Sequence, residues 1–376
     1  MPASRAEQHG FECVRIALIC VSLRGGGTER IVSRIANQLC SRHEVAVITL
    51  APMEPFFPLH QDVLVLQPAS VAVDAAKPVR VLRQIRHLVA SLREIRPDLC
   101  MVFGEDIAAP VNLFARFAGV RRIWNFFRGR PERSIAGLKG RMTRLTCRLS
   151  NQIFVQTMAG KAALSDFYPV GKLTVWPNPI EIPDAVISPE NREPLIVNVG
   201  SIGRLKNQQA LVRVFAELEG EAEHWKLLFV GDGPDRPGLE ASSRASTAAP
   251  RIRFAGEQKD VAGQLDRAAI FAFTSLSEGF PNALAEAMAA GCACISYDCP
   301  TGPAELIEHG VNGFLVEMGD EARFAELLQQ MIERDDLRAQ FSRNARASMR
   351  KFHAEQVLRQ LEDLIATETR DLGEAA

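Results

Sequence analysis

Two glutamates around a loop that turns into a helix are the residues of this 376-residue chain best suited to chemistry. Glu278 follows the apolar, strand-like run 269–273, and Glu286 comes eight residues later. Pro281 suits the first helical turn, and Gly291 suits the helix end. A helix that starts after a parallel strand presents free N–H groups and a positive dipole end, which favour a phosphate.

Carboxylates beside an anion site cost electrostatic energy unless each has a partner of its own. Sugar and ribose hydroxyls are the natural partners, so this segment predicts binding of a nucleotide-sugar diphosphate. The alternative is an amphipathic helix after a core strand, with two solvated glutamates.

Cations follow an earlier strand-like run, 195–199, at Arg204 and Lys206. They could neutralise a diphosphate and stabilise it as a leaving group. The alternative is a pair of surface charges beside a helix start.

Two glycine-rich loops also follow predicted strands. In the first, Gly25, Gly26 and Gly27 precede a predicted helix, so the backbone could approach a phosphate closely. The second contains Gly231 and Gly233. Neither matches a dinucleotide fingerprint, because Arg30 and Arg236 occupy the place of the third glycine. This disfavours a nicotinamide enzyme, and a plain tight turn remains the alternative at residues 25–27.

Alternating strand-like and helical patterns must position these residues, and they predict an α/β fold of two Rossmann-like, doubly wound domains. Helices are expected at 28–41, 79–95 and 354–367. Strands are expected at 14–20, 44–49, 99–103, 122–125, 152–155, 173–175, 195–199, 226–230, 252–254, 270–273 and 293–296. The stretch 177–194 is rich in proline and reads as a linker.

These motifs resemble those of the retaining glycosyltransferases of family 4 (glycosyl transferases group 1). The resemblance rests on the glutamate pair Glu278 and Glu286 and on further segments along most of the chain. They are residues 26–30, 177–179, 199–200, 206–208, 231–234, 298–307 and 310–316.

The resemblance implies a GT-B architecture, with two Rossmann-like domains facing across a cleft. The N-terminal, acceptor-binding domain would span 1–182, the donor-binding domain 183–352, and 353–376 would form a helix that returns to the first domain. The implied enzyme is a metal-independent hexosyltransferase with a front-face mechanism, in which the leaving phosphate helps to deprotonate the acceptor. The preferred donor is a UDP-linked hexose or hexosamine, with GDP-mannose second, and no cofactor is expected.

Roles for individual residues follow from the same resemblance. Glu286 would bind ribose hydroxyls, Gln258 and its neighbours the base, and Arg204 and Lys206 the departing diphosphate, with help from Gly26 and Gly27 and with Gly231 nearby. Glu278 would bind the sugar and the phosphates, together with backbone groups of Gly279, Phe280, Pro281, Asn282, Ala283 and Leu284. The sequence departs from the family at Ser201, where an arginine is common, and it lacks a first-domain histidine near the sugar.

Charge is unevenly distributed. Residues 1–185 carry 24 Lys and Arg against 15 Asp and Glu, whereas the remainder carries 20 against 30. Segment 121–148 holds eight arginines and Lys139, interleaved with Trp124 and two phenylalanines, against one acid. Such a surface suits anionic lipid headgroups or a pyrophosphate-linked acceptor, and a merely solvated basic face is the alternative. No nucleic-acid module accompanies it. Arg128 and Pro131 resemble an arginine–x–x–proline turn of relatives that use lipid-linked acceptors.

The remaining composition indicates a cytoplasmic enzyme, with peripheral contact at the inner membrane as a further expectation. Eight cysteines form no Cys-x-x-Cys pair, and no stretch is apolar enough to span a membrane or serve as a signal peptide. The expected acceptor is a glycan or lipid-linked glycan in surface polysaccharide or lipopolysaccharide assembly. A catalytically silent nucleotide-binding scaffold of the same fold is the rival hypothesis.

Overall fold

The computed structural model describes residues 13–69, 77–130 and 136–373. It divides into two compact units, with Met1–Asn178 and Glu355–Ala376 in unit 1 and Pro179–Ala354 in unit 2. The chain thus passes between units at 178/179 and 354/355, where the sequence suggested 182/183 and 352/353.

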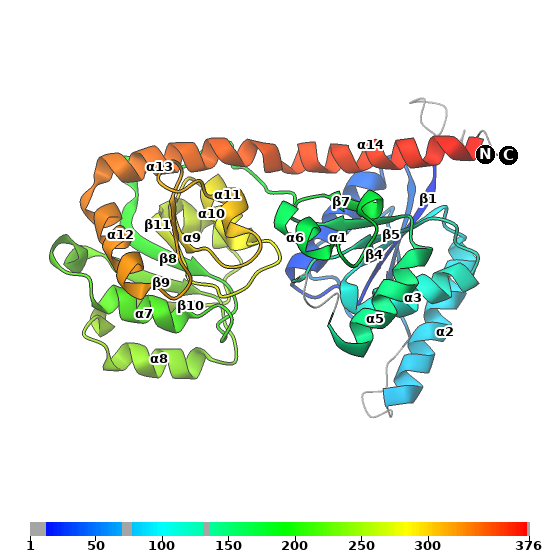
Figure 1. Cartoon of the computed structure of the whole chain (residues 1–376), viewed down its shortest axis with the longest axis horizontal. Coiled ribbons are helices and arrows are strands. Elements are labelled where there is room, and N and C mark those ends of the chain that lie inside the picture. The colour runs from blue at the N-terminus through cyan, green and yellow to red at the C-terminus, as the bar shows by residue number, and fades with distance from the viewer. Residues whose placement is uncertain (1–12, 70–76, 131–135, 374–376) are drawn as a thin grey trace. The chain divides into compact units, whose positions relative to one another are not determined.

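Unit 1 is built on a seven-stranded parallel sheet in the order β3-β2-β1-β4-β5-β6-β7 (Figure 1). Its strands are β1 (Arg15–Cys20), β2 (Glu44–Thr49), β3 (Leu64–Leu66), β4 (Leu99–Phe103), β5 (Ile123–Phe126), β6 (Gln152–Val155) and β7 (Leu173–Val175). Its main helices are α1 (Gly27–Leu39), α2 (Lys77–Ile95), α3 (Glu105–Phe117), α5 (Gly137–Thr146), α6 (Met158–Leu164) and nearly all of α14 (Ala354–Gly373).

Apolar clusters cover both faces of this sheet. Residues of α1 and α14 pack on one face, and residues of α2 and α3 pack on the other. The indole N–H of Trp176, just after β7, donates to the carbonyl of Val357 at 3.1 Å. Val357, Leu361 and Ile365 are fully buried in the same core as Trp176, so the last helix is an integral part of unit 1.

Unit 2 is built on a six-stranded parallel sheet in the order β10-β9-β8-β11-β12-β13. Its strands are β8 (Glu193–Val199), β9 (Lys226–Val230), β10 (Ile252–Gly256), β11 (Ala268–Phe273), β12 (Ala293–Tyr297) and β13 (Phe314–Val316). Its helices are α7 (Gln208–Ala216), α8 (Arg236–Ala245), α9 (Val261–Arg267), α10 (Asn282–Ala289), α11 (Pro303–Leu306), α12 (Glu321–Glu333) and α13 (Asp335–Ser348). Helices α7 and α8 lie on one side of the sheet and α9 and α10 on the other (Figure 1).

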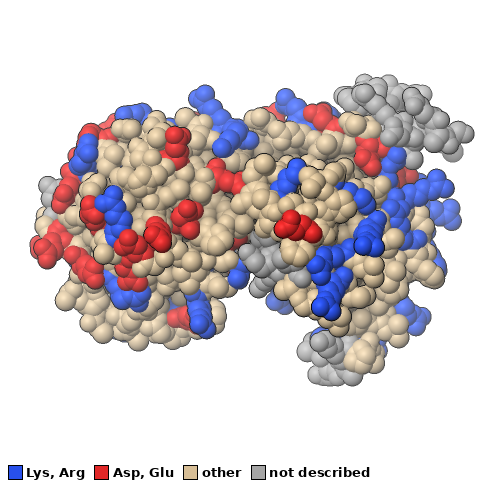
Figure 2. All heavy atoms as spheres, in the orientation of Figure 1, with Lys and Arg blue, Asp and Glu red and all other residues tan. Residues whose placement is uncertain are grey.

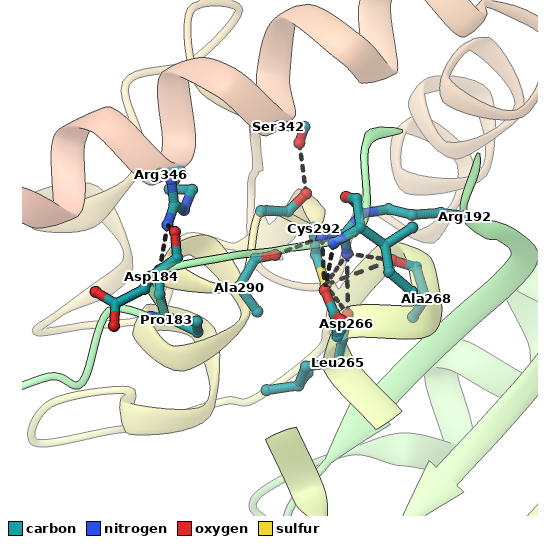
Figure 3. Close-up of polar contacts among 12 residues, drawn as sticks. Pro183, Asp184, Arg192, Leu265, Asp266, Ala268, Ala290, Cys292, Ser342 and Arg346 are labelled. Atoms are coloured by element: carbon teal, nitrogen blue, oxygen red, sulfur yellow. Dashed lines mark hydrogen bonds and ion pairs between the residues drawn. The ribbon is translucent and has the colours of Figure 1, made fainter. Parts of the chain in front are cut away.

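A buried guanidinium fixes the segment that leads into unit 2 (Figure 3). Arg192 is 9% exposed and lies 3.5 Å from the carboxylate of Asp266. Its N–H groups donate to the main-chain carbonyls of Ile187, Leu265, Ala268 and Ala290. The last three carbonyls belong to α9, β11 and the end of α10, so one side chain ties these elements to the start of β8.

The predicted strands all form, but the prediction missed one edge strand in each sheet, β3 and β13. Both have three residues and pair with a single neighbour. Such short segments carry too little alternation or apolar length to stand out as strands. Pairing with a neighbour that is distant in sequence decides their structure.

Candidate active site

Loops from two neighbouring strands meet where the strand order of the unit 2 sheet reverses. From β8 the chain proceeds to β9 on one side and returns to β11 on the other. In open parallel sheets, ligands bind beyond the carboxyl ends of the strands at such a point. Lys206, from the loop after β8, lies with Nζ 2.6 Å from Oε1 of Glu278, from the loop after β11. The side chains are 31% and 11% exposed, so a ligand can still reach the pair.

The backbone around Lys206 is firmly held. Asn207 adopts a left-handed conformation (φ 52°), which turns the chain into α7. The hydroxyl of Thr274 donates to the carbonyls of Lys206 and Asn207 at 3.2 and 3.0 Å. The Lys206 ammonium lies 5.5 Å from the ring centroid of Phe273. The ammonium therefore occupies a defined place before any ligand arrives.

Helix α10 begins four residues after Glu278. It starts at Asn282, and Pro281 is its N-cap. The sequence suggested that Pro281 would lie within the first helical turn, so the helix starts one residue later than expected. No side chain caps it, and the first turn of an α-helix leaves N–H groups, such as those of Ala283 and Leu284, without intrahelical acceptors. Glu286 is partly exposed in the second turn of this helix. The arrangement offers backbone donors and an ammonium to one anion.

The remaining side chains of the predicted segment belong to the core. Phe280 is 5% exposed and packs edge-on against Phe352, with ring centroids 5.8 Å apart. Leu284 is fully buried. Gly291 ends the helix with φ +80°, as its position predicted. At Phe280 and Leu284, only the backbone is available to a ligand.

A loop after β12 completes the surroundings of Glu278, and the sequence assigned it no role. Thr301 adopts φ 61°, and its hydroxyl donates to the carbonyl of Glu278. A Cβ at Gly302 would lie 2.4 Å from Cδ of Pro281, so only glycine fits against the start of α10. In the sequence, the adjacent Thr301 and Gly302 before Pro303 could have indicated this loop.

A thiol close to this pair is unsuited to nucleophilic catalysis. Burial, reinforced by the negative charge of Glu278, raises the pKa of Cys299 to about 12. The group is therefore a neutral thiol near pH 7, and the thiolate is the reactive form.

Glycines after β9 support the Lys206 loop. Gly231 has φ +133°, and a Cβ there would lie 2.1 Å from the carbonyl oxygen of Gly200. A Cβ at Gly233 would lie 2.2 Å from the carbonyl oxygen of Ile202. These glycines let two loops of unit 2 pack backbone to backbone, a structural role that the sequence did not assign to Gly231.

Two other predicted site residues lie apart from the ion pair. Arg204 is exposed and forms no hydrogen bond or ion pair within the described ranges. Gln258 is exposed after β10, the edge strand, and its amide donates to the carbonyl of Ala255 at 2.6 Å. Neither forms a hydrogen bond or ion pair with Lys206 or Glu278 within the described ranges.

In unit 1, a carboxylate of the protein itself lies against the glycine loop that precedes α1. Gly26 is the N-cap of α1 and Gly27 is the first residue of the helix. A Cβ at Gly26 would lie 2.3 Å from Oε2 of Glu29, so that carboxylate lies against the loop backbone. Phe56 packs similarly against Gly25. A phosphate at this loop would therefore have to displace the Glu29 carboxylate.

A second polar cluster lies after β5 in unit 1. The Arg128 guanidinium donates to the Asn178 side chain and lies 5.3 Å from the Trp176 ring. Its Nε and Nη1 atoms are shielded from solvent and have no hydrogen-bond partner in the described ranges. Gln156 also donates to Asn178, at 2.9 Å. Burial lowers the pKa of Arg128 to about 9, and the nearby Glu105 carboxylate opposes that shift.

The sequence singled out Arg128 but missed the two amides. Asn178 stood in a family-like motif without a role, and nothing marked Gln156. Pro131, the other residue of the proposed arginine–x–x–proline turn, lies outside the described residues. A buried cation with free donors suits an anionic ligand.

The described part of the chain also lacks some features. No group of three His, Cys, Asp or Glu side chains in it is arranged to hold a metal ion. None of its helices combines the length and apolar character needed to cross a bilayer. All eight cysteines are free thiols, and seven of them are buried.

Comparison with known families accounts for most of the chain. The family model for glycosyl transferases group 1 matches residues 181–348, and the model for Glycosyltransferase Family 4 matches residues 25–182. A Campylobacter jejuni α-1,4-N-acetylgalactosaminyltransferase, named for a diNAcBac-PP-undecaprenol-linked substrate, is 24% identical over 94% of this chain and 98% of its own. The lipopolysaccharide 1,6-galactosyltransferase of Escherichia coli K12 is 36% identical over 41% of this chain and 45% of its own.

Solved structures agree on the architecture. Anabaena HepE in complex with UDP superimposes with a TM-score of 0.78 at 18% identity, over 94% of this chain and 100% of its own. A sucrose-phosphate synthase from Thermosynechococcus elongatus gives 0.80 at 17% identity, over 96% and 100%. At these identities the likeness establishes the fold, and the predicted GT-B class of two Rossmann-like domains is confirmed.

Proposed function

We propose a donor, an acceptor class and a mechanism from the premise that this chain belongs to the group 1 glycosyltransferases of family 4. It transfers a hexose or hexosamine from a UDP-sugar to a glycan or lipid-linked glycan of a bacterial surface polysaccharide. The observation that carries this proposal is the Lys206–Glu278 pair beside the start of α10. GDP-mannose is the second choice of donor.

The donor's diphosphate would bind at the positive end of α10. Backbone N–H groups of the first turn and the Lys206 ammonium would share its oxygens, and a phosphate would then compete with Glu278 for Lys206. Glu278, released from that pairing, would accept hydrogen bonds from sugar hydroxyls. Glu286, one turn further along the helix, would accept hydrogen bonds from the ribose.

Transfer would proceed with retention on the face of the sugar that the phosphate leaves. The bond between the anomeric carbon and the phosphate oxygen breaks as the acceptor oxygen bonds to that carbon. The acceptor proton passes to an oxygen of the departing phosphate, whose developing charge Lys206 stabilises. No protein nucleophile is invoked, which agrees with the neutral Cys299 thiol.

A pyrophosphate-linked acceptor would suit the Arg128 cluster. The guanidinium there has two shielded donor atoms without hydrogen-bond partners in the described ranges, and a shielded donor that lacks an acceptor is costly. Separate phosphate oxygens could accept from these two donors. The name of the C. jejuni relative, which includes a PP-undecaprenol-linked glycan, supports this class of acceptor.

The test is a screen of nucleotide sugars. UDP-glucose, UDP-galactose, their N-acetylhexosamine counterparts and GDP-mannose are compared for protection against thermal unfolding, since a ligand at a hundred times its Kd adds about 2.7 kcal/mol. The protecting donor is then incubated with lipid-linked and soluble glycans, and sugar transfer is measured. Failure of every UDP-sugar to protect would remove the donor assignment.

The rival function is nucleotide binding without transfer. The exposed Arg204 and the Glu29 carboxylate against Gly26 favour it, because each weakens the expected phosphate contacts. The same screen separates the two functions. A silent scaffold would be protected by a UDP-sugar but would release no UDP with any acceptor.

Distinct roles for the two glutamates give a further prediction. Glu286→Ala should weaken binding of UDP about tenfold, because two hydroxyl contacts to a carboxylate are lost, whereas Glu278→Ala should leave UDP affinity within about threefold and slow transfer. Titration calorimetry with UDP and a transfer assay measure the two effects. Glu308→Ala, an exposed carboxylate elsewhere in unit 2, is the control. Unchanged UDP affinity in Glu286→Ala would refute the ribose role.

We also propose that α5 docks on an anionic membrane. Leu138, Met142 and Leu145 are 77%, 46% and 56% exposed and recur at helical spacing, with exposed Arg141 and Arg148 beside them. On the view in Figure 2, basic side chains gather over unit 1 near α3 and α5, and acidic side chains gather over unit 2. A face of this kind, apolar with a basic margin, suits the membrane interface.

Membrane docking would be reversible and sensitive to salt. Each Lys or Arg near an anionic surface contributes about 1 kcal/mol, so Arg141→Glu with Arg148→Glu should weaken binding to phosphatidylglycerol vesicles by about thirtyfold or more at low salt. Arg144 is left intact because it stacks on Phe167 at 5.2 Å. Lys226→Glu with Lys259→Glu, exposed in unit 2, is the control. If the parent ignores anionic vesicles at low salt, the acceptor is soluble and the lipid-linked assignment falls.

A further inference from the structure

A basic pocket lies at the amino-terminal edge of the unit 1 sheet, where β4, β5 and β6 begin. Its volume is about 720 Å³, within the usual range for small-molecule sites. The end of α2, the end of α3 and the loop before β5 form its walls. The Arg128 cluster follows the other end of β5. Four strand residues at about 3.3 Å each therefore separate the two sites by roughly 13 Å.

Charge in this pocket is strongly one-sided. Four arginines line it, Arg93, Arg96, Arg121 and Arg122, and its single acidic lining residue is Asp98. Asp98 is already engaged, because it accepts hydrogen bonds from the backbone N–H and the guanidinium of Arg15 at 2.9 and 3.1 Å. Burial opposes its ionisation, but Arg15 and the charge of Arg122 hold the pKa of Asp98 below its usual range. Even with Glu368, which forms an ion pair with Arg122, two carboxylates leave most of the charge of the four arginines and Arg15 unneutralised.

One arginine carries an unsatisfied donor. Nη1 of Arg122 is shielded from solvent and has no hydrogen-bond partner in the described ranges, and its Nε lies 3.9 Å from Glu368, beyond hydrogen-bond distance. A shielded donor on a charged group that lacks an acceptor is costly. An anion in the pocket would supply the acceptor.

Hydrogen bonds around the pocket occupy carbonyl oxygens that would otherwise repel an anion. Arg116 donates to the carbonyls of Val120 and Arg121 on the loop before β5, and to the carbonyl of Leu149 at 2.9 Å. Oδ1 of Asn151 accepts from the N–H of Ile123 at 3.0 Å, which leaves its amide nitrogen as the end available to a ligand. These four hydrogen bonds occupy acceptor oxygens, so those oxygens do not compete with an anion.

Backbone strain falls on a residue of the same pocket. Arg96 follows the last residue of α2 with φ 49°, a left-handed conformation in which glycine is usually found at this position. A side chain there costs roughly 1 kcal/mol or more relative to glycine. Arginine at this place has no packing role to offset the cost, because it is exposed.

From these features we propose that the pocket binds a phosphate-bearing ligand with at least two negative charges. Arginine forks match phosphate oxygens in a bidentate geometry, which favours phosphate over a single carboxylate. A soluble phosphorylated molecule and a phosphomonoester lipid headgroup share this chemistry. Binding there is separate from sugar transfer, since no residue of the pocket belongs to the donor or acceptor site described above.

The test uses the full-length protein and two probes, inorganic pyrophosphate and phosphatidylcholine vesicles with or without phosphatidate. Arg96→Gly with Arg121→Ser should lower pyrophosphate affinity at the pocket at least tenfold, seen in calorimetry as the loss of one binding equivalent. Arg83→Ser with Arg86→Ser, exposed on α2 outside the pocket, removes the same charge and should retain that equivalent. Arg96→Gly alone should weaken binding and also raise the midpoint of thermal unfolding, because it relieves the left-handed strain.

The outcomes distinguish a soluble ligand, a lipid headgroup and nonspecific binding. Loss of the pyrophosphate equivalent in the pocket variant alone supports a soluble ligand. Loss confined to phosphatidate vesicles supports a lipid headgroup. If the pocket variant and the Arg83/Arg86 control bind both probes alike, the charge is nonspecific and the proposal is overturned. UDP binding, unchanged in the pocket variant, separates this result from any failure of the donor assignment.

Discussion

Lys206→Ala should lower kcat/KM for sugar transfer by about a hundredfold or more, equivalent to about 2.7 kcal/mol of transition-state stabilisation. The ammonium is already placed, 2.6 Å from Glu278 and held by a backbone that Thr274 fixes, so it needs little rearrangement to meet a departing phosphate. The variant also leaves Glu278 unpaired beside the anion site, and repulsion should weaken UDP binding. A coupled assay for UDP release and calorimetry with UDP measure the two effects.

Two comparisons make this result interpretable. Lys226→Ala removes an exposed lysine from the start of β9 and should leave transfer unchanged. Lys206→Ala combined with Glu278→Ala should regain part of the lost UDP affinity, because the uncompensated carboxylate is gone. Transfer within a few-fold of the parent in Lys206→Ala would remove this residue from the site.

Arg192→Leu should lower the free energy of unfolding of unit 2 by about 3–5 kcal/mol. The substitution removes the guanidinium donor from four carbonyls and the ion-pair partner from Asp266, which keeps its hydrogen bond from the N–H of Ile187. Hydrogen exchange should therefore accelerate in β8, β11 and β12. Amides of the unit 1 sheet serve as an internal reference, since the change lies wholly within unit 2.

A matched variant at the surface tests whether the destabilisation by Arg192→Leu results from the burial of that guanidinium. Arg267→Leu removes a guanidinium from the same region, but that group is half exposed and pairs with Glu193 at 2.8 Å. Exposed ion pairs contribute about 0–1 kcal/mol, so exchange in this variant should change little. Equal effects of Arg192→Leu and Arg267→Leu would mean that the carbonyl contacts contribute nothing measurable.

The fold was largely readable from the sequence because parallel strands buried on both faces are continuous apolar runs. Strand β4, with all five residues buried, is an example. Strands β3 and β13 were not found, since pairing at a sheet edge depends on a neighbour distant in sequence. Arg192 was also missed. It lies in a proline-rich segment that reads as a linker, and only the folded structure brings three distant elements around it.

Individual residues of the candidate site were predicted from the sequence, but the contacts between them were not. Lys206 and Glu278 were each named, but 72 positions separate them, and their contact follows from the strand order, which periodicity alone does not give. Gly231 was expected at the ligand, whereas its close approach to Gly200 depends on the distance between two loops. The roles of Arg204, Gln258, Gly26 and Gly27 stay predictions. Gln156 had no signal, because a lone glutamine after a strand is uninformative.

The anchoring of α14 through Trp176 has a consequence for how the chain acquires its structure during synthesis. Unit 2 is one continuous segment, Pro179–Ala354, and it is complete before α14 leaves the ribosome. Unit 1 begins first but finishes last, because Val357, Leu361 and Ile365 supply part of its core. One apolar face of its sheet therefore stays partly exposed to solvent while unit 2 is translated and folds. Chaperone dependence and sensitivity to premature termination should accordingly fall on the domain made first.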